Sequence, residues 1–171
     1  DYTFPNVEYT AQQRMSAGIG LMNFAYELAR NGMFYSTKAG KKHAHFIAER
    51  HFYSLVKASL LISKERGNAP WIHKTKWVEG WLPIDTYNKG VDEIADFEYK
   101  YDWEGLRVEV KDNKGIAHSA LCSHMPGESS SQNLNATNGL YPVRKGNVLK
   151  TDGSKTNIFI APDWDNIRFN Y

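Results

Sequence analysis

The spacing of hydrophobic residues predicts a mainly helical first two thirds of the chain. Apolar side chains recur at three- and four-residue intervals at Met15, Ile19, Met22 and Tyr26. This is the period of a helix with one face on a core. We therefore expect a helix from an N-cap at Thr10 to about Arg30, despite Gly18 and Gly20 inside it, ended by Asn31-Gly32. A loop over residues 36–40 and a long helix over about residues 42–66 follow, and the wide apolar stripe of that helix predicts burial on more than one side.

Shorter helices are expected after this long one. The stop signal at residues 67–70 precedes a short helix over residues 74–79, and Asp102 is placed to cap a helix that runs to about Lys111. Residues 1–115 are therefore predicted to be mostly helical.

The last third alternates between strand and turn signals. The apolar run over residues 116–125 predicts a strand, which leads into a turn and a short helix over residues 130–135. In residues 140–171, two strand-like runs, 147–150 and 155–161, flank the hairpin signal Thr151-Asp152-Gly153-Ser154. Residues 163–171 resemble the start of a helix. The predicted fold class is α/β, mainly helical with a few strands.

Length and charge narrow the class of protein. A compact chain of 171 residues suits one domain and buries roughly 70% of its unfolded surface. Lys and Arg number 21 against 19 Asp and Glu, a net charge of +2, so bulk charge does not indicate nucleic acid as a partner. The apolar runs are far shorter than the roughly 20 residues of a membrane span, and the N-terminus lacks a signal pattern. We expect a soluble, cytoplasmic protein without nucleic-acid or membrane partners.

Cysteine and histidine content argues against metal chemistry. Cys122 is the single cysteine, which excludes an intrachain disulfide and a multi-cysteine zinc site and is best explained as a small buried core residue. His43 and His45 are two residues apart and point to different helix faces, so a metal site with His51 is not expected. His118 and His124 are an even number of residues apart on the predicted strand. They either add positive charge toward an anion or lie on the outer face of the strand.

The most informative chemical feature is the turn Pro126-Gly127-Glu128-Ser129-Ser130-Ser131. It follows a strand-like run and precedes a helix, and the unpaired N–H groups and positive dipole end of a helix can hold an anion. Glycine allows close approach to a ligand, and the serines offer N-cap and ligand hydroxyls. The alternative is an ordinary loop that caps a helix.

Two charged residues near the turn allow more than one role. The Glu128 carboxylate would repel a phosphate, so we expect it to accept hydrogen bonds from backbone N–H groups or a sugar hydroxyl. Arg144 either pairs with the same region or is a surface residue.

Several stretches together resemble the large (alpha) subunit of class I ribonucleotide reductases. They are Met125-Pro126-Gly127-Glu128-Ser129-Ser130-Ser131-Gln132, Asn135-Ala136-Thr137-Asn138-Gly139, Gly18-Ile19-Gly20 with Asn23-Phe24-Ala25-Tyr26, Leu82-Pro83-Ile84-Asp85-Thr86-Tyr87, Tyr101-Asp102-Trp103-Glu104 and Ala161-Pro162-Asp163. The resemblance covers essentially the whole chain and implies one internal segment, in the C-terminal half, of the ten-stranded α/β barrel of that subunit.

The resemblance implies a role in ribonucleoside-diphosphate reduction. The turn would hold the substrate diphosphate through Pro126, Gly127, Glu128, Ser129 and Ser130. Many relatives have serine at the position of Gly127, so a hydroxyl contact is lost there. Many also have an Arg-Asn pair where this chain has Ala117-His118.

The reaction itself would need parts that this chain lacks. Cys122 matches none of the family's catalytic cysteines, so we expect no catalytic residue here and no activity of the chain alone. No cofactor is expected to bind this chain. The assembled enzyme implies the remaining large-subunit segments, a small radical-generating subunit, an external dithiol reductant and nucleotide effectors. The alternatives are a stand-alone phosphate- or nucleotide-binding module and a structural fragment that complements the rest of the subunit.

Overall fold

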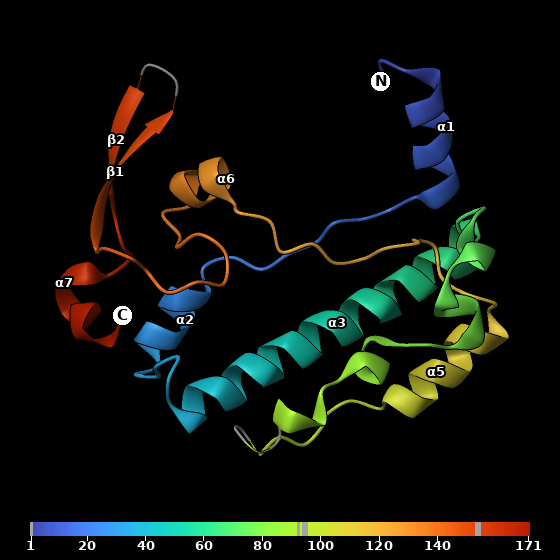
Figure 1. Ribbon diagram of the computed structural model, residues 1–171, viewed down its shortest axis with the longest axis horizontal. Helices are drawn as coiled ribbons and strands as arrows, with labels where there is room; N and C mark the ends of the chain where they lie inside the picture. The colour runs from blue at the N-terminus through green and yellow to red at the C-terminus, as the bar shows by residue number, and fades with distance from the viewer. Residues whose placement is uncertain (1, 92, 94–95, 153–154) are drawn as a thin grey trace. The chain divides into compact units, whose positions relative to one another are not determined.

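The computed structural model describes residues 2–91, 93, 96–152 and 155–171 (Figure 1). The chain divides into two compact units. The first comprises residues up to Ile19 together with Ala44–Ser123, and the second comprises Gly20–His43 and His124–Tyr171.

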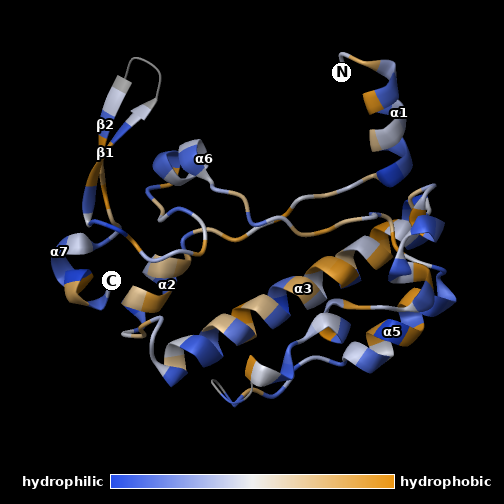
Figure 2. Cartoon of the chain, viewed as in Figure 1, coloured by the Kyte–Doolittle hydropathy of each residue, from blue (hydrophilic) through white to orange (hydrophobic). Residues whose placement is uncertain are grey.

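Helices and a single hydrophobic core build the first unit. Its elements are α1 (Pro5–Arg14), most of α3 (Lys38–Arg66), the 3-10 helices η1 (Ile72–Lys74), η2 (Lys76–Glu79), η3 (Pro83–Thr86) and η4 (Lys89–Val91), and α5 (Trp103–Asp112). The apolar stripe of α3 supplies Val56 and Leu60, which pack with Leu106 and Val110 of α5, and all four are at most 1% exposed. Figure 2 shows these hydrophobic stretches in orange along α3 and α5.

The single helix predicted up to Arg30 is wrong. Helix α1 ends at Arg14, where Met15 has a φ of 47°. The backbone is then extended: Ala17 N–H donates to Ala120 O at 2.9 Å, and Ile19 forms a parallel bridge with Cys122. Two glycines within three residues cost a helix roughly 1 kcal/mol each, and pairing with residues 120–123 satisfies the same backbone groups in extended form. The strand predicted over residues 116–125 is confirmed only in this short paired stretch.

The long helix and its neighbours agree better with the pattern. Helix α3 begins at Lys38, inside the predicted loop, because the Thr37 hydroxyl accepts from Gly40 N at 3.1 Å and caps it. The predicted helix over residues 74–79 consists of η1 and η2. The predicted cap of α5 is confirmed, since the Asp102 carboxylate accepts from Gly105 N at 2.8 Å.

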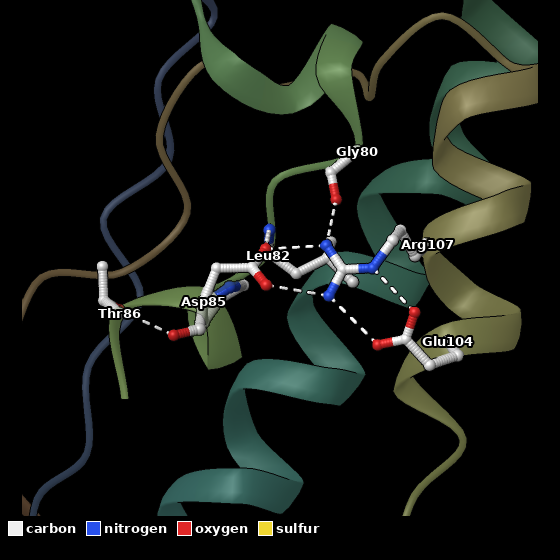
Figure 3. A network of polar contacts seen from close by, with 7 residues as sticks. Gly80, Leu82, Asp85, Thr86, Glu104 and Arg107 are labelled. Carbon is white, nitrogen blue, oxygen red and sulfur yellow. Dashed lines mark hydrogen bonds and ion pairs between the residues drawn. The ribbon is translucent and has the colours of Figure 1, made fainter. Parts of the chain in front are cut away.

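An arginine joins two segments of the first unit that are distant in sequence (Figure 3). The Arg107 guanidinium donates to both Asp85 oxygens at 2.7 and 2.9 Å, to Gly80 O at 2.6 Å and to Glu104 at 2.9 and 3.1 Å. The same Asp85 carboxylate accepts from Leu82 N at 2.7 Å and so caps η3. The hydrogen bond from Arg107 lowers the pKa of Asp85, which keeps this pair charged.

The second unit contains short helices and one hairpin. Its complete elements are α2 (Phe24–Arg30), α6 (Glu128–Asn133), β1 (Asn147–Asp152), β2 (Lys155–Ile160), α7 (Trp164–Ile167) and η5 (Arg168–Asn170). The predicted hairpin is confirmed as an antiparallel pair with Val148 opposite Phe159, although Gly153 and Ser154 of its expected turn lie outside the described residues. The helix start predicted after Asp163 is present as α7 and η5.

Among the helices of the described residues, none is both long and apolar enough to cross a bilayer.

Candidate functional site

The predicted anion turn lies at the start of α6. This helix begins at Glu128 with Gly127 as its N-cap residue, two residues before the predicted start, and no side chain caps it. The expectation that Ser129, Ser130 or Ser131 provides the N-cap is therefore wrong. Ser131 is fully buried and its hydroxyl donates to Glu128 O at 3.0 Å, since a serine inside a helix bonds to the preceding turn. Ser129 and Ser130 are exposed.

A loop asparagine holds the turn from the other side. The side-chain oxygen of Asn138 accepts from Gly127 N at 2.7 Å, and its amide nitrogen donates to Glu128 Oε1 at 2.6 Å. The second oxygen of Glu128 lies 3.9 Å from Lys150 Nζ. The partners of Glu128 are thus an amide and an ammonium group, not the backbone N–H groups that we expected.

A cavity of about 790 Å³ opens beside this turn, within the second unit. Pro126 and Glu128 line it, whereas Gly127, Ser129 and Ser130 are chain neighbours that do not. Its basic lining residues are His124, Arg144, Lys145 and Lys150, and its apolar wall includes Val148 and Phe159 of the hairpin. The arrangement combines a polar, basic rim with an apolar wall, as ligand sites commonly do.

Two polar side chains of the cavity are held in place. The Lys150 side chain is 17% exposed and its ammonium lies 4.5 Å from the centre of the Phe159 ring, so a cation–π contact fixes it near Glu128. The Tyr35 hydroxyl donates to Leu140 O at 2.8 Å. Burial raises the pKa of Tyr35 to about 12, so this group remains a neutral hydrogen-bond donor at physiological pH.

The histidines and the cysteine have separate surroundings. His124 accepts from Leu21 N at 3.4 Å in the second unit, and His118 contacts Ser59 Oγ at 2.8 Å in the first. Cys122 is half-buried, not fully buried as predicted, because it lies in the short paired stretch, and burial raises the pKa of its thiol. No group of three or more potential metal ligands occurs in the part of the chain that the structure describes.

Comparison with known proteins tests the resemblance. Residues 1–164 match the family described as ribonucleotide reductase, barrel domain. The chain belongs to this family. The predicted fold class is confirmed, since a mixed helical chain with few strands is a segment of the α/β barrel domain.

The relatives are much longer than this chain. The alpha subunit of ribonucleoside-diphosphate reductase 1 from Escherichia coli is 40% identical over 173 residues, covering 100% of this chain and 22% of the relative. The alpha subunit from Haemophilus influenzae is 38% identical with the same coverage. The alpha subunit from enterobacteria phage T4 is 43% identical over 143 residues, which cover 84% of this chain and 18% of the relative. The chain thus spans about a fifth of the length of these curated relatives.

Sequence reasoning missed three contributors to the site. Asn138 belongs to a stretch that carries the family resemblance, but its role needs the fold. Lys150 and Tyr35 give no signal in the sequence, because a lysine in a strand and a tyrosine in a loop are ordinary residues. The hairpin register, which places position 150 on the same face as Val148, brings its ammonium to the turn.

Proposed function

We propose that this chain is the part of a ribonucleoside-diphosphate reductase large subunit that binds and orients the diphosphate of the substrate. The observation that carries the proposal is the basic cavity beside the turn Pro126–Ser130, in a chain of the reductase barrel family. In the reaction of the whole enzyme, hydrogen replaces the ribose 2′-hydroxyl through a protein radical. The contribution of this chain is positioning, which lowers the barrier without bond chemistry of its own.

The charges around the turn suit a diphosphate. The N–H groups at the start of α6 are donors without intrahelical partners, and Arg144 and Lys145 add positive charge at the cavity. Glu128 would repel an anion, but Lys150 lies near enough to offset its charge. Gly127 N donates to Asn138, so the backbone donors that we propose for the diphosphate are those that follow Gly127, and Gly127 lacks the hydroxyl that many relatives carry.

Radical chemistry must come from other segments. Cys122 is the single cysteine of this chain, so the chain cannot supply a pair of redox cysteines. We propose that the assembled enzyme joins this chain to the remaining large-subunit segments and to a small radical-generating subunit, with an external dithiol as reductant and nucleotides as effectors. No cofactor is proposed for these residues.

Reconstitution tests the proposed function. The assembled large subunit is defined here as this chain combined with the segments that precede and follow it in its relatives. With the small subunit, we expect dithiol-dependent reduction of a ribonucleoside diphosphate only when this chain is included. Absence of turnover from a mixture whose pieces are shown to be folded and assembled would contradict the proposal.

A stand-alone nucleotide-binding module is the second candidate, because the cavity lies entirely within one compact unit. Calorimetry on the 171-residue chain separates the two: micromolar binding of nucleoside diphosphates favours the module, and no binding favours a site that needs its missing walls.

Replacing Ser129 and Ser130 by alanine in the assembled subunit tests the turn directly. Unchanged KM and kcat would leave only a structural role.

Lys150→Met is expected to raise the KM for the ribonucleoside diphosphate about tenfold in the assembled subunit. Removing the ammonium leaves the Glu128 charge beside the bound anion, and a charged contact of this kind corresponds to about one power of ten in affinity. Steady-state kinetics at fixed ionic strength measures the change. Lys114→Met, which removes an exposed cation of the first unit, is the matched control, and an equal effect of both variants would mean that bulk charge is responsible.

A further inference from the structure

Asn138 bridges the turn on both sides of the peptide that joins Gly127 to Glu128. One end of its carboxamide accepts from Gly127 N at 2.7 Å and the other donates to Glu128 Oε1 at 2.6 Å. A carboxamide offers an acceptor and a donor on two separate atoms. The side chain therefore fixes the backbone at the N-cap of α6 and the direction of the first acidic side chain together.

The loop that carries Asn138 is itself fixed to α6. Ala136 N–H donates to Ser131 O at 2.8 Å, near the end of the helix, while Asn138 reaches its beginning. The loop thus returns alongside the short helix and contacts it at both ends. Helix α6 has six residues, too few to be stable without such contacts.

A second asparagine anchors the same loop from the other end of the second unit's sequence. Asn23 N–H donates to Thr137 O at 2.8 Å, and the side-chain oxygen of Asn23 accepts from Thr137 N at 2.9 Å. Thr137 is 2% exposed. Asn23 holds a left-handed conformation with a φ of 68°, which asparagine tolerates better than most residues. Both backbone polar groups of Thr137, the residue before Asn138, are therefore hydrogen-bonded to Asn23.

We infer that Asn138 is a positioning residue for the diphosphate site, and that it acts by holding the Glu128 carboxylate away from the ligand. The inference rests on the proposed function. With Asn138 in place, the Glu128 carboxylate is directed toward the carboxamide and toward Lys150. Without it, the Gly127 N–H loses its acceptor and the carboxylate is free to turn toward the bound diphosphate, where it repels that anion.

Three variants separate these steps. Asn138→Leu keeps the branching of the side chain at Cγ and removes both hydrogen bonds. Asn138→Leu combined with Glu128→Gln removes the repelling charge as well. Asn133→Leu changes an exposed asparagine at the far end of α6 and is the matched control.

The readouts are kinetic and structural. In the assembled subunit, Asn138→Leu is expected to raise the KM for the ribonucleoside diphosphate about tenfold or more, the size of a lost hydrogen bond to a charged group, with kcat within about threefold. The added Glu128→Gln change is expected to recover most of the KM, which loss of structure alone would not allow. By NMR on the full chain, amide exchange at Gly127 is expected to be at least about tenfold faster in Asn138→Leu. The Asn133→Leu control is expected to match the unaltered protein in both measurements.

Each other result overturns the inference in a distinct way. Unchanged exchange at Gly127 would show that Asn138 does not hold the turn. Faster exchange with unchanged KM, while alanine at Ser129 and Ser130 does raise KM, would reject the positioning role and leave the proposed function intact. A KM that no variant of the turn or of Asn138 alters would reject the diphosphate site itself.

Discussion

Replacing Glu49 by leucine is expected to lower the free energy of unfolding of the chain by about 3–5 kcal/mol, since three donors lose their acceptor and each such loss costs about 1–3 kcal/mol. Glu49 is 4% exposed on α3, and its carboxylate accepts from Lys100 N at 2.9 and 3.1 Å, Tyr101 N at 3.1 Å and Trp103 Nε1 at 3.1 Å. One side chain thus satisfies two backbone N–H groups and an indole. Leucine would leave all three donors without this acceptor, and the Trp103 indole among them is buried.

Urea unfolding of the full chain measures this loss, and amide exchange at Lys100 and Tyr101 localises it. Glu49→Gln retains one acceptor oxygen but directs an amide group at the other donors. Its free energy of unfolding is therefore expected to lie between those of the unaltered protein and Glu49→Leu. Glu65→Leu changes an exposed glutamate on the same helix and is expected to alter the free energy by no more than about 0.5 kcal/mol. Equal losses for the buried and the exposed position would show that leucine in α3, not the lost carboxylate, is the cause.

The sequence predicts elements where local chemistry decides the conformation. The long helix α3 and the Asp102 cap of α5 both depend on residues within a few positions of each other, and both elements are confirmed. The burial predicted on more than one side of α3 is wrong, because its buried side chains share one face: Glu49, Val56, Ser59, Leu60 and Ser63. The helix predicted through Gly18 and Gly20 fails because its period is real but competes with pairing to residues 120–123, which lie about a hundred positions away. A pattern window cannot weigh such a partner.

The candidate site likewise has parts that local sequence predicts and parts that depend on distant contacts. Its turn could be found from Pro126 and Gly127, because proline and glycine restrict the backbone locally. The start of α6 was misplaced, since glycine at the N-cap left the serines no capping role. The cavity could not be predicted at all, because Tyr35, Asn138 and Lys150 line it together only through the loop contacts and the hairpin register. The Glu49 contacts are invisible for the same reason, because a glutamate in a helix is usually solvated.

The Arg107 network should make the stability of the first unit depend on pH. Arg107→Met is expected to lower the free energy of unfolding at pH 7 by about 2–3 kcal/mol, the scale of hydrogen bonds to charged groups. The guanidinium side chain is only 21% exposed and that of Asp85 26%, so water replaces the lost contacts incompletely. The Asp85 carboxylate would then still accept from Leu82 N at the start of η3, without a neutralising charge beside it.

The direction of this pH dependence follows from the lowered pKa of Asp85. The hydrogen bond from Arg107 places the pKa of Asp85 in the folded chain below its unfolded value of about 4. A carboxyl group of this kind stabilises the fold above the unfolded pKa, and that contribution is lost as the pH falls through the folded pKa. The difference between the unaltered protein and Arg107→Met should therefore be full at pH 7 and shrink below about pH 4. Glu104 contributes in the same direction, because the hydrogen bond from Arg107 lowers its pKa too.

Urea unfolding at pH 7, 5 and 3 tests this dependence, and Arg66→Met, an exposed arginine at the end of α3, controls for loss of a positive charge. Glu109 is a second source of acid sensitivity, since Lys57 and Lys64 lower its pKa, but both variants keep that group. Subtracting the two variants thus isolates the link between η3 and α5. A difference that stays constant from pH 7 to pH 3 would mean that the guanidinium stabilises the fold through its contact with Gly80 O and its packing, with no contribution from the two carboxylates.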